Sequence, residues 1–409
     1  MTETQKKALA VGNRLNLLQE WSAPLILGVL FALWVANTST GLYAEILEWK
    51  PFGDFHLLGH MVTFHFLVND IFMVFFFGIA AKEITESFLP GGDLNPVSKA
   101  INPLIGTIGG VLGPIAVFFV LTTWIFSGHA DLAIIQNGWG IPTATDIALA
   151  WLVARMVLGK DHPAVKYLLL LAVLDDAIGL VIIAKWYPDP NFPVEPIWLL
   201  LVAAGMAVAL ILRKKAPHQW KWTIGVGGGL SWTGLMLAHI HPALALVPIV
   251  PFLLGPKKDT GMYAERDEVD IDHRGHHSPL HTFEESLKTP VDYGLFFFAF
   301  CNAGVQFDAI GPVTWIILAS LIVGKTIGIS LFSIVAMGLG APLPEGMKIR
   351  HVLIVSFIAG LGLTVALFVT GEAYPDGSAY QAAAKMGALF SGFIFAIIIP
   401  ARILKKRDS

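Results

Sequence analysis

The stretch LLLLAVLDDAIGLVIIA, residues 168–184, is apolar enough to lie inside a membrane, yet Asp175 and Asp176 stand side by side at its centre. Each central aspartate costs about 2.5–3.5 kcal/mol on a membrane-insertion scale, and each Leu, Ile, Val or Phe returns about 0.3–0.6 kcal/mol. Over residues 167–184 the return of roughly 3–7 kcal/mol only balances the cost of about 5–7 kcal/mol. The aspartates therefore need partners inside a helix bundle, and ionisable groups at that depth are usually functional.

The composition of the whole chain is that of a membrane protein. Of its 409 residues, 55% are hydrophobic and 14% are charged, whereas soluble domains have about 25% charged residues. We expect a single domain over residues 1–409, in contact with the lipid bilayer and not with nucleic acid. Its longest polar insert, residues 256–289, is predicted to be a cytoplasmic loop. Apolar runs of roughly 17–25 residues, long enough to cross a bilayer as helices, predict twelve spans at 22–38, 57–81, 101–126, 135–158, 164–186, 195–213, 219–238, 240–255, 290–306, 312–338, 350–371 and 381–403.

The basic residues predict the orientation of these spans. Lysine and arginine gather in both tails and in alternate loops, and the exceptions are Lys50, Lys185, Lys325 and Lys385. Because cytoplasmic loops carry the excess of lysine and arginine, both termini are expected on the cytoplasmic side.

Few other charges lie at the centre of a span. They are Asp146 in GWGIPTATDIALAWLV, Lys325 in LASLIVGKTIGISLF, and Asp70, which could instead be a structural polar contact of Asn69. Since neighbouring helix residues point about 100° apart, Asp175 and Asp176 have different surroundings. One can meet a counter-charge while the other faces a cavity. The alternative is that neighbouring polar groups satisfy the pair for packing alone.

Two of the spans are interrupted. Gly140 and Pro142 precede Asp146 in span 4, and Gly360 and Gly362 lie at the centre of span 11. Interrupted spans at corresponding places in two halves point to an ion site in transporters. The predicted fold is an all-α polytopic membrane protein with inverted repeats and two crossed discontinuous helices. If like helix ends meet there, Asp146 offsets the positive ends and Lys325 the negative ends.

Several motifs resemble those of the NhaA-type sodium/proton antiporters of bacterial inner membranes. They are NDIFMVFFF, IPTATDIALA, VLDDAIGLVIIA, FAFCNAGV, GKTIGISL, LPEG and GLGLTVALF, in a region from about residue 22 to residue 402. The resemblance implies exchange of Na⁺ or Li⁺ for H⁺, with these ions as substrates and no cofactor. It also implies location in the inner membrane and a role in sodium and pH homeostasis.

The resemblance further implies roles for individual residues. Asp176 would be the main cation and proton carboxylate, and Asp175 would bind beside it and pair with Lys325. Thr145 and Asp146 would line the same site. If both Asp176 and the Asp175–Lys325 pair change protonation in each cycle, two protons move per sodium ion and exchange is electrogenic.

The positions that resemble the family's pH-responsive region depart from its pattern. Glu83 matches a family glutamate, Glu86 stands where arginine is usual, and Glu285 matches a glutamate near span 9. His241, in AHIHPALA, matches a family histidine that is either a pH-responsive group or an interface residue. The resemblance also implies a homodimer, joined partly through the loop at 40–56.

Three other functions remain as alternatives. A sodium-coupled symporter of organic solutes would share the architecture but would need no intramembrane lysine. An intramembrane aspartyl protease usually has its aspartates on separate helices, one of them in a Gly-x-Gly-Asp step that this chain lacks. A channel would not need a proton-binding pair in broken helices.

Overall fold

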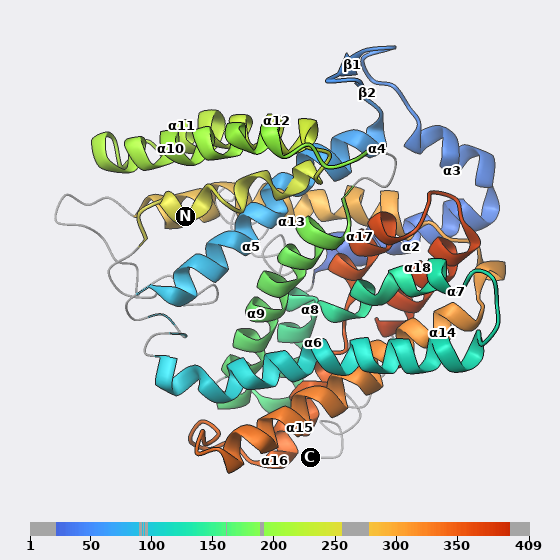
Figure 1. Cartoon of the computed structure of the whole chain (residues 1–409), viewed down its shortest axis with the longest axis vertical. Helices are drawn as coiled ribbons and strands as arrows, with labels where there is room; N and C mark the ends of the chain where they lie inside the picture. The colour runs from blue at the N-terminus through green and yellow to red at the C-terminus, as the bar shows by residue number, and fades with distance from the viewer. Residues whose placement is uncertain are drawn as a thin grey trace, which may run out of the picture.

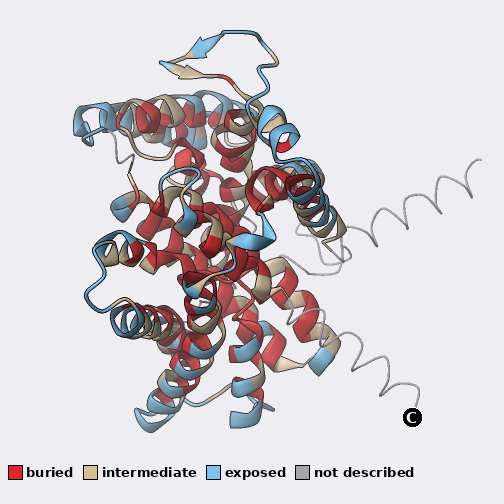
Figure 2. Ribbon diagram, turned by 90° about the vertical axis from the view of Figure 1, so that its right-hand side faces the viewer, coloured by how far each residue is buried: buried red, intermediate tan, exposed pale blue. Residues whose placement is uncertain are grey.

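The computed structural model describes residues 22–89, 92, 94, 97–160, 162–188, 192–255 and 278–392. Most of these residues are helical (Figure 1). Among the described residues, five helices are long and apolar enough to cross a membrane, or up to seven if each of two bent pairs is one span. The chain is therefore a helical membrane protein, and its buried residues concentrate at the centre of the bundle (Figure 2).

The helices of the first half are those that carry most of the predicted site. Their bounds are α2 Ala23–Thr38, α3 Thr40–Leu47, α4 Phe64–Phe66, η1 Leu67–Phe72, α5 Met73–Phe88, α6 Val97–Ile125, α7 Leu132–Gln136, η2 Asn137–Thr143, α8 Ile147–Leu158 and α9 Pro163–Trp186. The segments α4, η1 and α5 form one continuous apolar helix, Phe64–Phe88.

The second half contains the second bent pair, α16 and α17, followed by α18. The bounds are η3 Pro196–Trp198, α10 Leu199–Lys215, α11 Trp220–Trp222, η4 Thr223–Gly228, α12 Gly229–Leu237, η5 Pro242–Leu246, η6 Val250–Phe252, α13 Pro279–Ala303, η8 Phe307–Ala309, α14 Pro312–Ala319, η9 Ser320–Gly324, α15 Lys325–Gly338, α16 Ile349–Ile358, α17 Leu363–Ala373 and α18 Ala379–Ser391. The α10–α12 layer lies at the opposite end of the molecule from α6, α15 and α16 (Figure 1).

Two predicted span boundaries are wrong. Span 2 was expected at 57–81, but the helix runs over Phe64–Phe88, so Lys82, Glu83 and Glu86 lie inside it. The helix continues through these charges because they pair with one another in the protein interior. Span 9 was expected from 290, but α13 begins at Pro279. Residues 279–289 therefore belong to a helix and not to the predicted 256–289 loop, whose residues 256–277 lie outside the described chain.

The segment 40–56, which was predicted to be a loop, is partly helical. Residues 40–47 form helix α3, and a short antiparallel hairpin pairs His56 with Met61 and Leu57 with His60. The hairpin projects beyond the helices (Figures 1 and 2). Its turn places Leu58 and Gly59 at φ 50° and 89°. Leucine is uncommon at positive φ, which is why the sequence pattern did not indicate a turn there.

Glycines bring α6 and α15 into close backbone contact. A Cβ added at Gly113 or Gly328 would meet backbone atoms of the facing helix. Small residues of this kind let membrane helices approach closely. The approach matters for the interior, because a Cβ at Gly110 of α6 would lie 3.4 Å from Asp175 Oδ1 on α9. The glycine seam thus keeps space open beside the aspartate pair.

We expect Gly328→Ala to lower the melting temperature of the detergent-purified protein, because the added methyl group forces two backbones apart at a cost of about 1–3 kcal/mol. Gly338→Ala is the matched control on the same helix, since a Cβ there meets nothing within 4 Å. The control should leave the melting temperature unchanged or slightly raised. Equal melting temperatures for the two variants would contradict the close approach.

Candidate ion-binding site

The breaks in spans 4 and 11 contact each other. The α7–η2 segment and α8 meet at a bend of 51°, and α16 and α17 meet at a bend of the same size. The backbone N–H of Asp146, in the first break, donates to the carbonyl of Leu361, in the second, over 2.6 Å. A Cβ at Gly362 would lie 3.1 Å from the Ala144 carbonyl, so glycine allows this approach.

Asp146 caps both half-helices that begin at the breaks. Its Oδ1 accepts from the Leu149 N–H of α8 over 3.1 Å. Its Oδ2 accepts from the backbone N–H and the hydroxyl of Thr364 in α17 over 3.2 and 3.0 Å. Helix amino ends carry free N–H groups and partial positive charge. A single carboxylate therefore offsets two such ends in the buried interior.

Asp175 and Lys325 form an ion pair beside this junction. Lys325 Nζ lies 2.5 Å from Asp175 Oδ2, and the side chains are 0% and 1% exposed. Lys325 also donates to the Thr145 hydroxyl over 2.8 Å. That hydroxyl can donate to Asp175 Oδ2 over 2.8 Å or to the Ala359 carbonyl over 2.9 Å, and its single proton serves one of them at a time. Thr145 thus links the ion pair to the carboxyl end of α16.

Asp176 has different surroundings from its neighbour. Its side chain is buried, at 7% exposure, and its Oδ1 accepts no hydrogen bond from the described residues. Asp175 Oδ1 is in the same condition, whereas Asp175 Oδ2 is occupied by Lys325. Two buried carboxylate oxygens to which no described residue donates suit a proton or a small hard cation that prefers oxygen ligands.

The predicted break residues divide into two groups. Gly360 and Gly362 lie between the end of α16 and the start of α17. Gly140 and Pro142 instead lie inside the 3₁₀ segment η2, and the extended backbone begins at Ala144. The break in span 4 thus comes later than the glycine and proline suggested. The tighter 3₁₀ turn accommodates Pro142, which disfavours α-helix at the residue before it.

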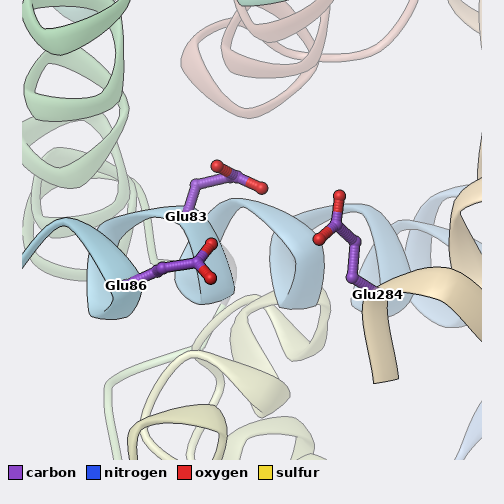
Figure 3. A group of neighbouring side chains, drawn as sticks. All are labelled: Glu83, Glu86 and Glu284. Carbon is purple, nitrogen blue, oxygen red and sulfur yellow. The ribbon is translucent and has the colours of Figure 1, made fainter. Parts of the chain in front are cut away.

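A second group of charges lies where α5 contacts α13. Glu83, Glu86 and Glu284, named here the acidic cluster, bring carboxylate oxygens within 4.8 Å of one another (Figure 3). Lys82 is completely buried at its centre. Its Nζ lies 3.2 Å from Glu83 Oε1 and 2.6 Å from Glu284 Oε2, and it also pairs with Glu86. The lysine therefore stabilises a buried group that would otherwise carry three negative charges.

Two of the residues predicted to respond to pH lie outside this cluster. Glu285 is exposed, and Glu284 takes the place beside Glu83 that the sequence pattern gave to Glu285. His241 caps η5 through Nδ1, and its Nε2 lies 3.2 Å from Glu372 Oε1 near the end of α17. Its ring packs on Phe368 with centroids 4.7 Å apart.

Sequence reasoning missed several residues of these sites: Lys82, Glu284, Thr364 and Glu372. The spacing of Lys82 and Glu86 by four residues is a signal for a helix pair, but Lys82 was assigned to a loop. Thr364 stands in the quoted motif GLGLTVALF beside the predicted glycines. Glu284 and Glu372 gave no signal of their own, because their partners lie far away in the sequence.

The fold and the site define a class of protein: a polytopic membrane protein whose buried carboxylates and lysine meet at the junction of two broken helices. Comparison with known proteins agrees, since the model of the Na⁺/H⁺ antiporter 1 family matches residues 16–404. The chain belongs to this family.

Curated relatives cover nearly the whole chain. A Na⁺/H⁺ antiporter NhaA of Geobacter sulfurreducens is 53% identical over 94% of this chain and 96% of its own length. One from Desulfitobacterium hafniense is 54% identical over 95% and 93%. A more divergent one, from a Jannaschia species, is 39% identical over 92% and 94%.

We predict that Lys82→Met lowers the melting temperature strongly, because it leaves buried glutamates without their cation, at a cost of about 3–5 kcal/mol. Lys288→Met is the matched control. Lys288 also lies near Glu284, at 3.9 Å, but its side chain is 44% exposed, and exposed pairs contribute about 0–1 kcal/mol. Similar losses in the two variants would show that Lys82 does not hold the acidic cluster together.

Proposed function

We propose that this protein is a secondary active transporter that exchanges Na⁺ or Li⁺ for H⁺ across the bacterial inner membrane. The proposal rests on two buried carboxylate oxygens beside Lys325, Asp175 Oδ1 and Asp176 Oδ1, which accept no hydrogen bond among the described residues. Membership of the Na⁺/H⁺ antiporter 1 family supports it, as do the curated names of its relatives. The transported ions are its only substrates; it needs no cofactor and is not an enzyme.

In this proposal Asp176 holds either the cation or a proton. Burial disfavours a bare charge on Asp176, so the carboxylate is occupied in both halves of the cycle. Sodium takes oxygen ligands from Asp176, from Asp175 and from groups freed at the breaks, including the Thr145 hydroxyl. Competition between proton and cation for one site that opens alternately to the two sides is antiport.

The Asp175–Lys325 pair supplies a second proton site. When sodium recruits Asp175 Oδ2, Lys325 loses its counter-charge and releases a proton. When sodium leaves on the other side of the membrane, Lys325 takes up a proton there and the ion pair forms again. Two protons then move for each sodium ion, and the exchange responds to the membrane potential. Thr145 supports this step, because its hydroxyl proton can turn from Asp175 to the Ala359 carbonyl as the pair rearranges.

We further propose the complete topology as twelve spans in two inverted repeats, with spans 4 and 11 crossed at their breaks. The contact between Asp146 and Leu361 supports the crossing. The distribution of lysine and arginine supports cytoplasmic termini. The end of span 12 and the polar loop at 256–277 lie outside the described residues. For the homodimer, the projecting hairpin at 56–61 is a better candidate than the 40–56 segment, because its strand edges are accessible for pairing with a second copy.

We predict that Asp176→Asn reduces sodium-driven proton movement to the level of protein-free liposomes. Asparagine keeps the shape of the side chain but neither binds a proton nor offers a charge to sodium. The measurement is the response of a pH-sensitive dye to a sodium pulse in proteoliposomes. Asp54→Asn is the control, since Asp54 is exposed on the projecting loop and pairs only with Lys50 among the described residues. Retained sodium-dependent quenching in Asp176→Asn would remove Asp176 from the site.

We predict that acid inhibition arises from competition at Asp176 and not from the acidic cluster or His241. Lowering the pH should raise the apparent KM for sodium, while the rate at saturating sodium changes little. The matched variants Glu284→Gln, in the acidic cluster, and Glu285→Gln, exposed beside it, should have the same pH midpoint at saturating sodium. A midpoint that moves only in Glu284→Gln, and stays moved at high sodium, would assign the response to the cluster that also contains Glu83 and Glu86.

A further inference from the structure

Two tyrosines attach the outer part of span 4 to its neighbours. Tyr187 follows the last residue of α9, and its hydroxyl donates to the Asn137 carbonyl over 2.7 Å and accepts from the Gly140 N–H over 2.8 Å. Tyr374 follows α17, and its hydroxyl donates to the Ile135 carbonyl over 2.7 Å. Both tyrosines are only 2% exposed. They therefore join the α7–η2 segment to the ends of two other helices in the protein interior.

These two rings explain why glycine stands at both positions 138 and 140 of the sequence GWG. A Cβ at Gly140 would lie 2.7 Å from the Tyr187 ring, and a Cβ at Gly138 would meet the Tyr374 ring and hydroxyl. Trp139, between them, packs against Tyr187 with ring centroids 6.2 Å apart. Gly138 and Gly140 thus form seats for two aromatic rings and do not form the helix break.

A third link joins the same elements. The Asn137 side chain donates to the Ala373 carbonyl over 2.7 Å, one residue before Tyr374. All three links lie on the same side of the ion site. Tyr187 lies eleven residues after Asp176, or roughly 16 Å along a helix at 1.5 Å per residue. Tyr374 lies ten residues after Thr364, roughly 15 Å away by the same measure.

These links connect the helices that hold the ion site at their other ends. The α7–η2 segment leads into Thr145 and Asp146, α9 carries the aspartate pair, and α17 begins with the Thr364 contact to Asp146. An ion that leaves towards the ends of α9 and α17 has to pass where these segments are held together. Separation of α7–η2 from its neighbours would break every one of the three links.

We propose that Tyr187, Tyr374 and Asn137 form a latch that closes the ion site on the periplasmic side. The proposal rests on the proposed exchange function and on the orientation given above. The latch is closed in this structure. Opening it breaks the tyrosine hydrogen bonds, and the rings leave the glycine seats. A net hydrogen-bond contribution of about 0.5–1.5 kcal/mol corresponds to a roughly 2- to 10-fold change in the open population for each hydroxyl removed.

The test uses Tyr187→Phe and Tyr374→Phe, which remove the hydroxyls and keep the rings in their seats. Tyr43→Phe is the matched control, because the buried Tyr43 hydroxyl also donates to a backbone carbonyl, that of Phe300, over 2.7 Å but lies outside the latch. The reporter is a cysteine at Ala144, a fully buried position between the latch and the site. It is placed in a Cys301→Ala background, since Cys301 is the only cysteine.

The measurement is the rate at which a membrane-impermeant maleimide labels Ala144→Cys from the periplasmic side of right-side-out vesicles. Each latch variant should label roughly 2- to 10-fold faster than the Tyr43→Phe control, with no change in labelling from the cytoplasmic side of everted vesicles. The apparent KM for sodium should fall on the periplasmic side only.

Equal labelling in latch and control variants would overturn the latch, as would faster labelling from both sides, which indicates general loosening. If a tyrosine variant aggregates in size-exclusion chromatography, Asn137→Ala carries the same test through the third link, and its labelling at the control rate would overturn the proposal. These results are distinct from a failure of the proposed function, which would appear as absent sodium-driven proton movement in the unmodified protein.

Discussion

The buried ion pair between Asp175 and Lys325 is the constraint on which the rest of the structure depends. Neither charge can stay in the membrane interior alone, because an unpaired buried charge costs several kcal/mol. The pair lies at 2.5 Å with both side chains almost fully buried. Three spans must therefore meet at this point: α9 with the aspartate, α15 with the lysine, and span 4, which contributes Thr145.

Asp146 and Thr145 satisfy free backbone groups at the two helix breaks beside the ion pair. Free backbone groups at membrane depth are tolerated only where protein or a water-filled cavity satisfies them. Asp146 accepts hydrogen bonds from the starts of α8 and α17, and Thr145 donates to the end of α16 or to the ion pair. With those positions occupied, Asp175 Oδ1 and Asp176 Oδ1 accept no hydrogen bond from the part of the chain that the structure describes. In the proposed exchange function, these two oxygens are the place for a proton or a cation.

The sequence predicted those features that are energetically unfavourable in an isolated membrane helix and can therefore be recognised in a single segment. An aspartate pair in an apolar run, a lone lysine in another and glycines at mid-span each conflict with an isolated membrane helix, and the motifs then indicated the family. Features that depend on distant partners were not predictable in this way. Lys82 has the sequence context of a loop residue, and only the folded structure shows that Glu284, far away in the sequence, neutralises its charge. Gly140 has the sequence context of a helix breaker, but in the structure it leaves space for the Tyr187 ring. Nothing in the sequence indicates the positive φ of Leu58.

A double-mutant cycle on the ion pair tests the central claim most directly. The melting temperatures of Asp175→Asn, Lys325→Met and the double variant are measured in the same detergent and lipid, because such a cycle isolates the pairwise interaction. The account predicts that each single variant loses stability, by about 3–5 kcal/mol, and that the double variant loses clearly less than the sum of the two. Strictly additive losses would show that the two charges do not depend on each other and would contradict the account.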